Sequence, residues 1–414
     1  MSYDLAVIGA GPAGLTAARV AAKRGLRVAL LDAYATTGGQ FLRGTAQPRL
    51  TGVDVLLGQR VWAVEKSAGA FLVHASTTVT AATLLVATGA HDRVIPFPGW
   101  DLPGVLTAGG AQALVKGERI RPGEEMVVAG TGPFLLPVAV TLLDAGVRVK
   151  EVLEANRPSP RMAAALARIP SKATEALGYA RRLAEARVPY RTGHAVVAAH
   201  GEDSVEGVTV AKLTADWKPY AWRTVDCDTV AVGYGFTPQA DLPLQLGCAF
   251  SGDHVVTDDR QRTSVEGVLA AGEVTGVAGA PSAVVEGALA VHALVGEPPP
   301  RLLAEKARLR RFARALELSY PVRDGWRDWL TPDTVVCRCE EVTLRAIDEA
   351  RDLGAHDPRT LKLLARPGMG WCQGRMCGHA VARLTGHEPA PQKRPFAQPI
   401  TLADLTLHDR EDNA

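Results

Sequence analysis

The 414-residue sequence is poor in aromatic side chains and has no excess of charge of one sign. Phe, Trp and Tyr make up 5% of the chain, and 46 Lys and Arg residues are balanced by 44 Asp and Glu residues. These two features argue against a nucleic-acid partner and against direct binding to a charged membrane surface. The apolar share of 47% and the charged share of 22% are those of a folded chain, which excludes a mainly disordered protein.

Several signatures of catalysis and targeting are also missing. The chain has no HExxH, GxSxG or P-loop pattern, and no closely spaced cysteine pair lies near a glycine turn. The redox disulfide of the flavin disulfide reductases is therefore absent. The opening residues MSYDLAVIGAG contain no basic stretch followed by an apolar segment, so we expect a cytoplasmic protein. Peripheral attachment to a membrane through a complex is an open alternative.

The clearest positive signal is a strand, glycine turn and helix that occur twice. Residues 5–14 read LAVIGAGPAG and residues 126–135 read MVVAGTGPFL. A further strand-like run follows each, GLRVALLDA from Gly25 and GVRVKEVLEA from Gly146. Two such βαβ units predict an α/β chain with two Rossmann-like dinucleotide-binding domains.

The remaining segments suggest how these domains are arranged along the chain. Short β-rich runs at 59–87 lead back to the first sheet, and TSVEGVLAAGEVTG at 263–276 returns to the pattern of strand, turn and helix. We therefore expect the second domain to be inserted into the first, with a proline-marked connector behind them. The predicted spans are the first domain at 1–110 and 241–297, the second at 111–240, a helical connector at 298–330, a cysteine module at 331–385 and an extended tail at 386–414.

The first glycine turn has the spacing of a pyrophosphate-binding loop. Gly9 permits the tight turn, Gly11 lets the backbone approach a pyrophosphate, and Gly14 lets the helix pack on the strand. The helix N-terminus would direct unpaired N–H groups at the phosphates. Asp32, at the end of the next strand, is placed to accept hydrogen bonds from ribose hydroxyls.

The second glycine turn departs from this pattern. Leu135 stands where the third glycine is expected, and we expect it to hold the helix off the strand or to block a ligand. Glu154 still occupies the ribose-binding position. Two alternatives remain open: the domain binds an adenine nucleotide, ATP or NAD, or it keeps the fold and has lost the ligand.

Four of the six cysteines are concentrated near the C-terminus in the pattern C-x-C-x32-C-x4-C. In a cytosolic chain such a cluster favours a metal over disulfides. Four thiolates suit zinc or an iron–sulfur cluster, although structural zinc sites more often use C-x2-C pairs. The ligand candidates are Cys337, Cys339, Cys372 and Cys377, whereas Cys227 and Cys248 stand alone.

These motifs together carry a family resemblance. IGAGPAG, GGQ at 38–40, ATGA at 87–90 and AAGEVTG resemble the flavoproteins that include thioredoxin reductase. With CRCEE and GMGWCQGRMCG added, residues 3–385 resemble the α (A) subunit of heteromeric amino-acid dehydrogenases, such as opine oxidases, proline and hydroxyproline dehydrogenases, and hydrogen cyanide synthase. The cysteine module is similar to the bacterioferritin-associated-ferredoxin type of [2Fe–2S] domain.

The resemblance implies a set of cofactor contacts. It places FAD on the first glycine turn and its ribose on Asp32, and a [2Fe–2S] cluster on the four clustered cysteines. Most of the superfamily has Asp at the position of Glu273, so the longer side chain is a departure. The implied FAD contacts are Gly9, Gly11, Pro12, Ala13, Gly14, Asp32, Ala33, Gly39, Gln40, Val61, Thr88, Gly89, Gly272 and Glu273.

The function implied by the resemblance is electron transfer within a complex. Relatives oxidise a C–N bond on an FAD-dependent β subunit, often hold FMN at the subunit interface and pass electrons to an acceptor, and some have a small third subunit. We place FMN on no residue of this chain and nominate no catalytic acid or base. The alternatives are a stand-alone NAD(P)H-dependent ferredoxin-type reductase and a non-catalytic redox sensor.

Overall fold

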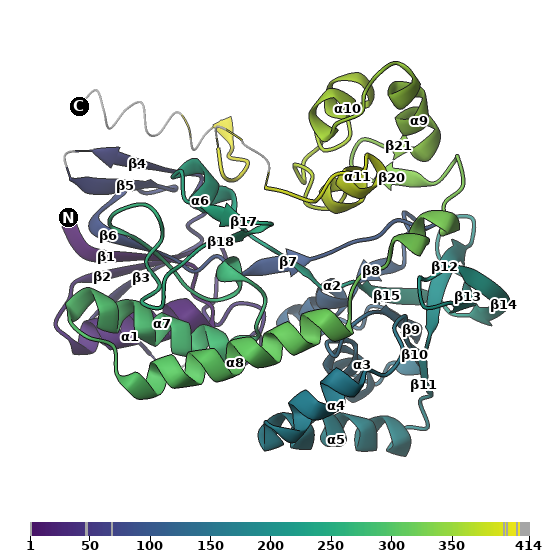
Figure 1. Cartoon of the computed structure of the whole chain (residues 1–414), viewed down its shortest axis with the longest axis horizontal. Coiled ribbons are helices and arrows are strands. Elements are labelled where there is room, and N and C mark those ends of the chain that lie inside the picture. Colours follow the sequence, from purple (N-terminus) through teal and green to yellow (C-terminus); the bar gives the residue numbers. More distant parts are fainter. Residues whose placement is uncertain are drawn as a thin grey trace. The chain divides into compact units, whose positions relative to one another are not determined.

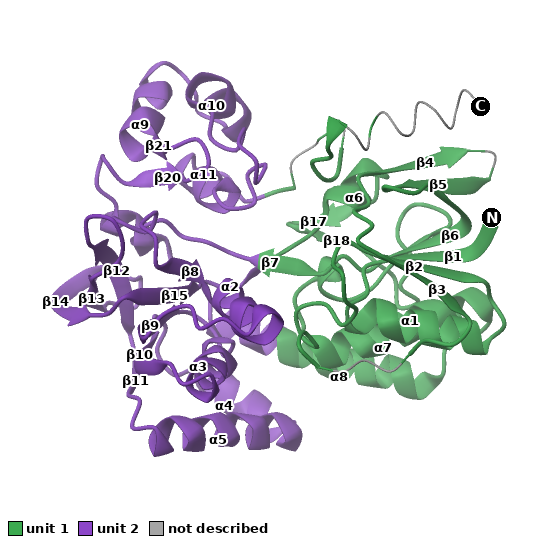
Figure 2. Cartoon of the chain, turned by 180° about the vertical axis from the view of Figure 1, so that it is seen from behind, with its two compact units in different colours: residues 1–91, 237–313, 390–414 green, residues 92–236, 314–389 purple. Residues whose placement is uncertain are grey.

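The computed structural model describes residues 2–45, 49–67, 69–391, 394, 396–402 and 405. Much of the tail predicted at 386–414 therefore lies outside the described residues. Figure 1 shows an α/β chain, as expected from the two βαβ units. The chain divides into two compact units, coloured separately in Figure 2: unit 1 comprises 1–91, 237–313 and 390–414, and unit 2 comprises 92–236 and 314–389.

Unit 1 is built on a seven-stranded sheet in which the buried run of Leu5 to Ile8 forms a central strand. Four strands run in parallel in the order β3-β2-β1-β6, and a hairpin continues the sheet antiparallel to the first half of β6. β19 pairs in parallel with the second half of β6. The strands are β1 (Ser2–Ile8), β2 (Val28–Asp32), β3 (Val53–Leu57), β4 (Ala63–Ser67), β5 (Ala70–His74), β6 (Val79–Val86) and β19 (Val268–Ala270).

Two helices of unit 1 pack against each other beside this sheet. Helix α1 (Pro12–Lys23) follows the first glycine turn, and α7 (Ala280–Val295) packs closely against α1. This approach needs a glycine at position 287, because a Cβ there would overlap the carbonyl oxygen of Ala13. Helix α8 (Pro300–Ser319) begins in this unit, at the predicted connector. The smaller elements are α6 (Asp241–Gln245), β17 (Phe250–Ser251), β18 (His254–Val255) and the 3-10 helix η2 (Glu273–Thr275).

Unit 2 contains an entirely parallel five-stranded sheet in the order β11-β10-β9-β15-β8. Its central strands β9 and β15 are mostly apolar and buried, as expected for a parallel sheet covered by helices, whereas the edge strand β11 is partly exposed. The strands are β8 (Val105–Thr107), β9 (Glu125–Gly130), β10 (Arg148–Glu154), β11 (Tyr190–Thr192) and β15 (Thr229–Gly233). The helices are α2 (Ala108–Ala113), the π-helix η1 (Leu114–Glu118), α3 (Leu135–Asp144), α4 (Pro160–Ala167) and α5 (Pro170–Glu185).

The rest of unit 2 shares a core with this sheet. Trp326, Val336 and Leu361 belong to the same buried cluster as Val127 and Val208. The cysteine module is thus packed into the second unit. The three-stranded antiparallel sheet of this unit consists of β12 (His194–His200), β13 (Gly207–Leu213) and β14 (Pro219–Asp226). The 3-10 helix η3 (Asp324–Trp329) precedes the cysteine module, whose elements are β20 (Val335–Cys337), β21 (Val342–Thr343), α9 (Leu344–Asp352), α10 (Pro358–Ala365) and α11 (Gly378–Leu384).

Two of the unit boundaries fall earlier than the spans drawn from the sequence, and the second segment of unit 1 ends later, at 313 and not at 297. The chain passes between units at β7 (Ala90–Asp92) and β16 (Phe236–Pro238), whereas the sequence pattern divides it at 110/111 and 240/241. The difference arises because β8 pairs with β15, a strand more than 120 residues later, and so joins the second sheet. Within the described ranges, no helix has the length and apolarity needed to cross a lipid bilayer.

Candidate functional site

The first glycine turn has the geometry of a pyrophosphate cradle. Gly9 adopts φ +107°, and a Cβ there would overlap the carbonyl oxygen of Ala87. A Cβ at Gly14 would likewise overlap the carbonyl oxygen of Gly9, which shows how closely α1 packs on the turn. Gly11 differs, because no atom lies within 4 Å of a Cβ built there. The backbone at Gly11 is therefore open to a ligand, beside the unpaired first N–H groups of α1.

Asp32 lies at the end of β2, directly beside this turn. Its carboxylate accepts hydrogen bonds from the backbone N–H of Ala10 at 2.6 Å and of Tyr34 at 2.8 Å. Burial raises the pKa of Asp32, and the two N–H groups and Arg43 oppose that shift. A carboxylate has about four acceptor positions, so two remain for ribose hydroxyls.

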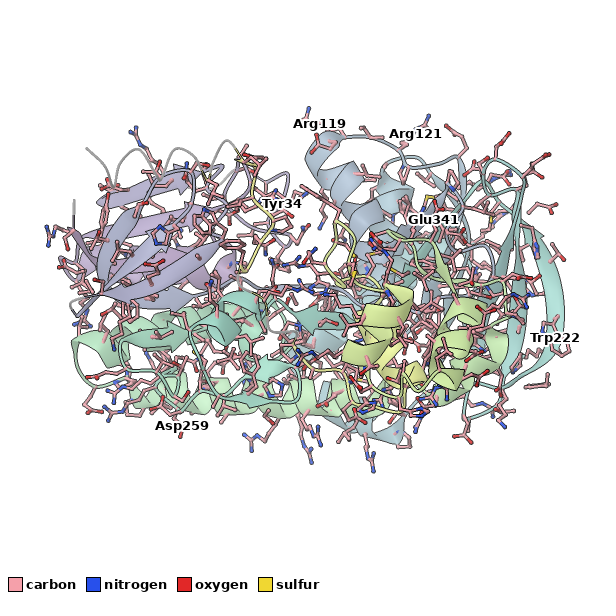
Figure 3. All side chains as sticks on the ribbon, turned by 90° about the horizontal axis from the view of Figure 1, so that it is seen from above. Tyr34, Arg119, Arg121, Trp222, Asp259 and Glu341 are labelled. Atoms are coloured by element: carbon pink, nitrogen blue, oxygen red, sulfur yellow. The ribbon has the colours of Figure 1, made fainter. Side chains whose placement is uncertain are left out.

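The loop after β2 closes over the open glycine. A Cβ at Gly39 would lie 3.0 Å from the Cα of Gly11, so a side chain there would crowd the cradle. Tyr34, labelled in Figure 3, is half exposed on this loop. The guanidinium of Arg43 lies 4.7 Å from the centroid of its ring. Gln40 is exposed and its amide lies 3.5 Å from the Tyr34 hydroxyl.

The other residues of the implied FAD set also belong to unit 1, but their roles differ. Val61 is buried in the core, Ala33 is exposed, and the Thr88 hydroxyl donates to the carbonyl of Gln239 at 2.7 Å. The N–H of Gln239 donates to the carbonyl of Gly89 at 2.8 Å. These contacts fix the loop that follows β6. Because β6 runs parallel to β1, this loop lies at the same edge of the sheet as the glycine turn that follows β1.

The turn after β19 carries Gly272 and Glu273. Gly272 adopts φ +83°, and a Cβ there would lie 3.1 Å from the Cβ of Ala13 in the first turn of α1. Burial raises the pKa of Glu273, whose carboxylate accepts a hydrogen bond from the backbone N–H of Gly279. The side chain of Glu273 thus supports its own loop, beside the start of α1.

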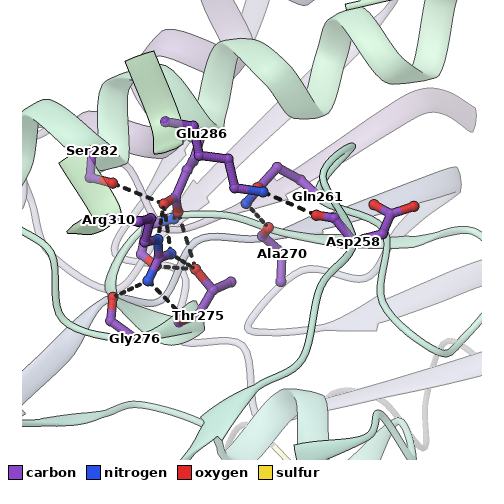
Figure 4. A network of polar contacts seen from close by, with 10 residues as sticks. Asp258, Gln261, Ala270, Thr275, Gly276, Ser282, Glu286 and Arg310 are labelled. Atoms are coloured by element: carbon purple, nitrogen blue, oxygen red, sulfur yellow. Dashed lines mark hydrogen bonds and ion pairs between the residues drawn. The ribbon is translucent and has the colours of Figure 1, made fainter. Parts of the chain in front are cut away.

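Two residues behind this turn were missed by the sequence analysis. Glu286 of α7 is fully buried and is bonded to Arg310 of α8, and both contact the turn (Figure 4). The one sequence signal is a glutamate in the otherwise apolar helix APSAVVEGALAVHALV. A buried carboxylate needs hydrogen-bond partners, so this residue should have indicated a polar network.

The four clustered cysteines meet in unit 2. Cys337 ends β20, Cys339 lies in the turn before β21, and Cys377 precedes α11. The thiol of Cys377 donates to Cys337, which lowers the pKa of Cys337 to about 6 and raises that of Cys377. Cys339 is hydrogen-bonded in the same way to Cys372, whose backbone N–H also reaches its sulfur.

Glycines and backbone amides surround these thiols. A Cβ at Gly370 would lie 2.5 Å from the Cβ of Cys339, so only glycine permits this approach of the loop. The backbone N–H groups of Gly368, Glu340 and Cys339 donate to the sulfur of Cys337. Such N–H···S bonds are how a protein adjusts the potential of a bound iron–sulfur cluster.

The thiols form two pairs and not a single tetrahedral set. Across the described part of the chain, no three His, Cys, Asp or Glu side chains converge as they would around one metal ion. The two pairs are close enough for the charges of Cys372 and Cys339 to act on Cys377, so all four thiols belong to one cluster of side chains. Cys337 and Cys377 are buried, whereas Cys339 is exposed and Cys372 partly so.

The second glycine turn is bound to its own acidic residue. Glu154 is 1% exposed, and its carboxylate accepts from the Thr131 hydroxyl at 2.8 Å and from the N–H of Gly132 at 2.7 Å. The N–H of Asn156 donates to it at 2.8 Å, and the Asn156 amide donates to the carbonyl of Pro321 at 3.0 Å. The position expected to bind ribose is therefore used within the protein.

Three tyrosines lie near this carboxylate. Burial, and next the negative charge of Glu154, raise the pKa of Tyr234 and of Tyr320, in the latter case to about 12. Partial burial, and next the charge of Glu154, also raise the pKa of Tyr190, although this residue is 42% exposed. The hydroxyl of Tyr234 is buried without a hydrogen-bond partner in the described structure. Burial in turn raises the pKa of Glu154 to about 7.

Leu135, which stands at the position of the third glycine in the second turn, lies in the core of unit 2. Its side chain is buried, with a methyl group 3.5 Å from a Cβ built on Gly233 of the neighbouring strand. A Cβ at Gly132 would have no neighbour within 4 Å. Leu135 therefore occupies the core between helix and sheet.

Comparison with known proteins places this geometry among flavoproteins. Residues 3–290 match the family described as pyridine nucleotide-disulphide oxidoreductase. The chain is 32% identical to the HcnB subunit of hydrogen cyanide synthase from Pseudomonas protegens, over 99% of both chains. It is 34% identical to the A-type subunit of opine oxidase from Agrobacterium tumefaciens, over 97% of this chain and 91% of that one.

Solved structures show the same fold. L-proline dehydrogenase from P. horikoshii superposes with a TM-score of 0.68 and 21% identity, over 98% of this chain and 79% of that chain. Thioredoxin reductase from T. acidophilum gives 0.56 at 24% identity, over 71% of this chain and 97% of that chain. The second match stops short of the full length, which is consistent with an additional C-terminal part here.

Proposed function

Because the chain belongs to the pyridine nucleotide-disulphide oxidoreductase family, we propose that it is the FAD- and [2Fe–2S]-containing electron-transfer subunit of a heteromeric amino-acid dehydrogenase. The relatives confirm the resemblance to the A-type subunits of opine oxidase and to the HcnB subunit of hydrogen cyanide synthase. The proposed reaction is oxidation of a C–N bond in an amino acid, imino acid or opine, carried out on a partner subunit.

The observation that carries the proposal is the pairing of a glycine cradle with a set of four thiols in one chain. The cradle is open at Gly11 and flanked by Asp32, which suits the pyrophosphate and ribose of FAD. The thiols form two hydrogen-bonded pairs within a loop that has glycine at the points of closest approach. A protein that moved electrons through only one cofactor would need only one of these sites.

The chain's own groups determine what each site can do. When bound, FAD exchanges two electrons at a time or one, and the cluster exchanges single electrons. Gly9, Gly11 and Gly14 shape the pyrophosphate site, and Asp32 orients the ribose. The N–H groups of Gly368 and Glu340 stabilise negative charge on the sulfur of Cys337. No residue of the chain is assigned to acid–base catalysis.

The proposed partners follow from the relatives. Both are named as subunits, so we infer an FAD-dependent β subunit that oxidises the substrate, together with an electron acceptor. An FMN at the subunit interface and a small third subunit are further parts of this proposal. The exposed position of Cys339 is compatible with electron exchange at the surface of the cysteine module.

A stand-alone NAD(P)H-dependent reductase is the alternative, and one contact argues against it. Glu154 is buried and bonded to the second glycine turn, so it is not available to bind the ribose of a nicotinamide nucleotide. We infer that the second domain has kept the fold without this function. Anaerobic addition of NADH and of NADPH to the purified chain tests the point, since prompt bleaching of the flavin would support the reductase.

The decisive experiment is cofactor analysis of protein purified anaerobically after co-expression with the neighbouring reading frames. About two irons and two sulfides per chain, with FAD and a second flavoprotein chain, would support the proposal. Zinc in place of iron, with FAD and no partner, would overturn it. Protein that carries both cofactors and a partner but reduces no dye with any amino acid would favour the redox sensor.

A further inference from the structure

We propose that Glu286 and Arg310 are positioning residues that hold the turn Gly272–Gly276 in the shape that FAD requires. The inference rests on the FAD site proposed above, and it assigns a function to a buried ion pair outside every sequence motif. Figure 4 shows the network in which the two side chains lie. Glu286 comes from α7 and Arg310 from α8, so two helices meet at one loop.

The carboxylate of Glu286 is directed at the turn and is completely buried. It accepts hydrogen bonds from the N–H of Gly272 at 2.9 Å, from the hydroxyl of Thr275 at 3.1 Å and from the hydroxyl of Ser282 at 3.0 Å. A buried carboxylate with three such donors and a guanidinium is fully satisfied. Its contacts fix the first and fourth residues of the turn.

The guanidinium of Arg310 holds the other end of the turn. Its Nε donates to Glu286 at 2.8 Å, and its Nη1 donates to the carbonyls of Thr275 at 3.0 Å and Gly276 at 3.2 Å. Its Nη2 donates to the Thr275 hydroxyl at 2.5 Å. Arginine alone among the side chains offers enough fixed donors for all these acceptors.

The turn in question lies against the FAD cradle. A Cβ at Gly272 would lie only 3.1 Å from the Cβ of Ala13, which is the second residue of α1. Gly287, the residue after Glu286, packs on the carbonyl of the same Ala13. A displacement of the Glu286–Arg310 pair would therefore be transmitted to the pyrophosphate end of α1 through direct contacts.

A purely structural role would be to attach α8 to unit 1, and a neighbouring residue separates the two roles. Lys306, one turn earlier on α8, donates to the carbonyl of Asp258 at 3.0 Å, which lies outside the turn. Burial lowers the pKa of Lys306 and the negative charge of Glu286 opposes that shift, so Lys306 lies near the ion pair, although its hydrogen bond goes to Asp258 and not to the turn. If the ion pair only anchors α8, loss of Lys306 and loss of Arg310 should have similar effects on FAD binding.

The test measures the dissociation constant of FAD by flavin fluorescence, together with the thermal midpoint of the apo-protein, in the full chain. We expect Arg310→Met and Glu286→Gln to weaken FAD binding at least about tenfold, which is 1.4 kcal/mol. Arg310→Lys, which keeps the charge but not the planar donors, should recover part of the loss. Lys306→Met should lower the thermal midpoint and leave FAD affinity within about twofold.

Arg308→Met is the matched control, because Arg308 pairs with Glu305 on the exposed side of α8 and should change neither quantity. FAD affinity unchanged in both Arg310→Met and Glu286→Gln would overturn the inference, whatever the thermal midpoint. A wild-type protein that binds no FAD would instead overturn the proposed function. If a variant does not fold, Arg310→Lys and Thr275→Val test the same contacts with smaller changes.

Discussion

The backbone N–H of Gly132 donates to the carboxylate of Glu154 at 2.7 Å, just as the N–H of Ala10 donates to Asp32 at 2.6 Å. In each βαβ unit, the acidic residue at the end of the second strand thus stabilises the glycine turn that follows the first strand of the same unit. The units differ in what else surrounds the acid. Asp32 has an exposed loop beside it, whereas Glu154 is 1% exposed and is hydrogen-bonded to Thr131 and Asn156.

The enclosure of Glu154 predicts a pH-dependent stability. Burial raises the pKa of Glu154 from 4.5 to about 7, so between these values the folded chain holds a proton that the unfolded chain has lost. Stability therefore falls as pH rises from about 4.5 to 7 and is level above that, with a total change of up to about 3 kcal/mol. Urea unfolding at pH 5, 6, 7 and 8 measures it.

Glu154→Gln should remove this part of the pH dependence, because glutamine does not titrate. Asp32, Asp92 and Glu273 also have pKa values raised by burial, but they are present in both proteins and cancel in the difference. Parallel stability curves for the wild type and Glu154→Gln between pH 5 and 8 would show that Glu154 is ionised throughout.

A second prediction concerns the open glycine of the first turn. Gly11→Val should leave the fold intact, because Gly11 has φ −75° and no atom lies within 4 Å of a Cβ there. The valine side chain would project into the pyrophosphate space, so we expect apo-protein with an unchanged thermal midpoint and less than about a tenth of the wild-type FAD content. Flavin absorbance of the purified variant measures this.

Gly14→Ala is the contrasting variant. Its Cβ would overlap the carbonyl of Gly9, so it should destabilise the protein itself and not only the cofactor. Normal FAD content in Gly11→Val would show that the pyrophosphate does not bind at this turn, and it would contradict the proposed FAD site.

The sequence was sufficient for features that local chemistry determines. The turn at Gly9 needs a positive φ, and the strands on either side of it are continuous apolar runs, so both βαβ units could be located from their residues. A helical connector was expected within 298–330, and α8 runs over Pro300–Ser319, because the composition of this segment favours a helix.

Features that depend on contacts between residues far apart in the sequence could not be predicted from local sequence patterns. β8 belongs to the second sheet because Val105 pairs with Val230, and no local signal in its three residues indicates that partner. Glu286 and Arg310 are 24 residues apart on two helices, so their ion pair appears only when the helices are packed. The hydrogen bond from Asn156, a partner of Glu154, to the carbonyl of Pro321 likewise joins residues 165 positions apart.

A third prediction tests the thiol set. Cys339→Ser should abolish iron and acid-labile sulfide binding and the visible absorption that accompanies them, because it removes one partner of the Cys339–Cys372 pair. Cys248→Ser is the control, since Cys248 is a buried lone thiol of unit 1 and should change none of these quantities. Wild-type iron and sulfide in Cys339→Ser would exclude Cys339 as a ligand.

The last prediction compares two helical glycines whose surroundings are opposite. Gly287 in α7 packs on the carbonyl of Ala13, and an added Cβ would overlap that oxygen. Gly178 in α5 is exposed, with no atom within 4 Å of an added Cβ. Gly178→Ala should therefore stabilise the chain by roughly 0.5–1 kcal/mol, because alanine has the higher helix propensity.

Gly287→Ala should destabilise the chain, since α7 must move away from α1 to admit the methyl group. We expect a loss of at least about 1 kcal/mol in unfolding free energy, in the range for overpacking, together with weaker FAD binding. Urea unfolding and FAD titration of both variants provide the comparison. If Gly287→Ala were as stable as the wild type and retained FAD, α1 and α7 would not be in the close contact that connects Glu286 to the cradle.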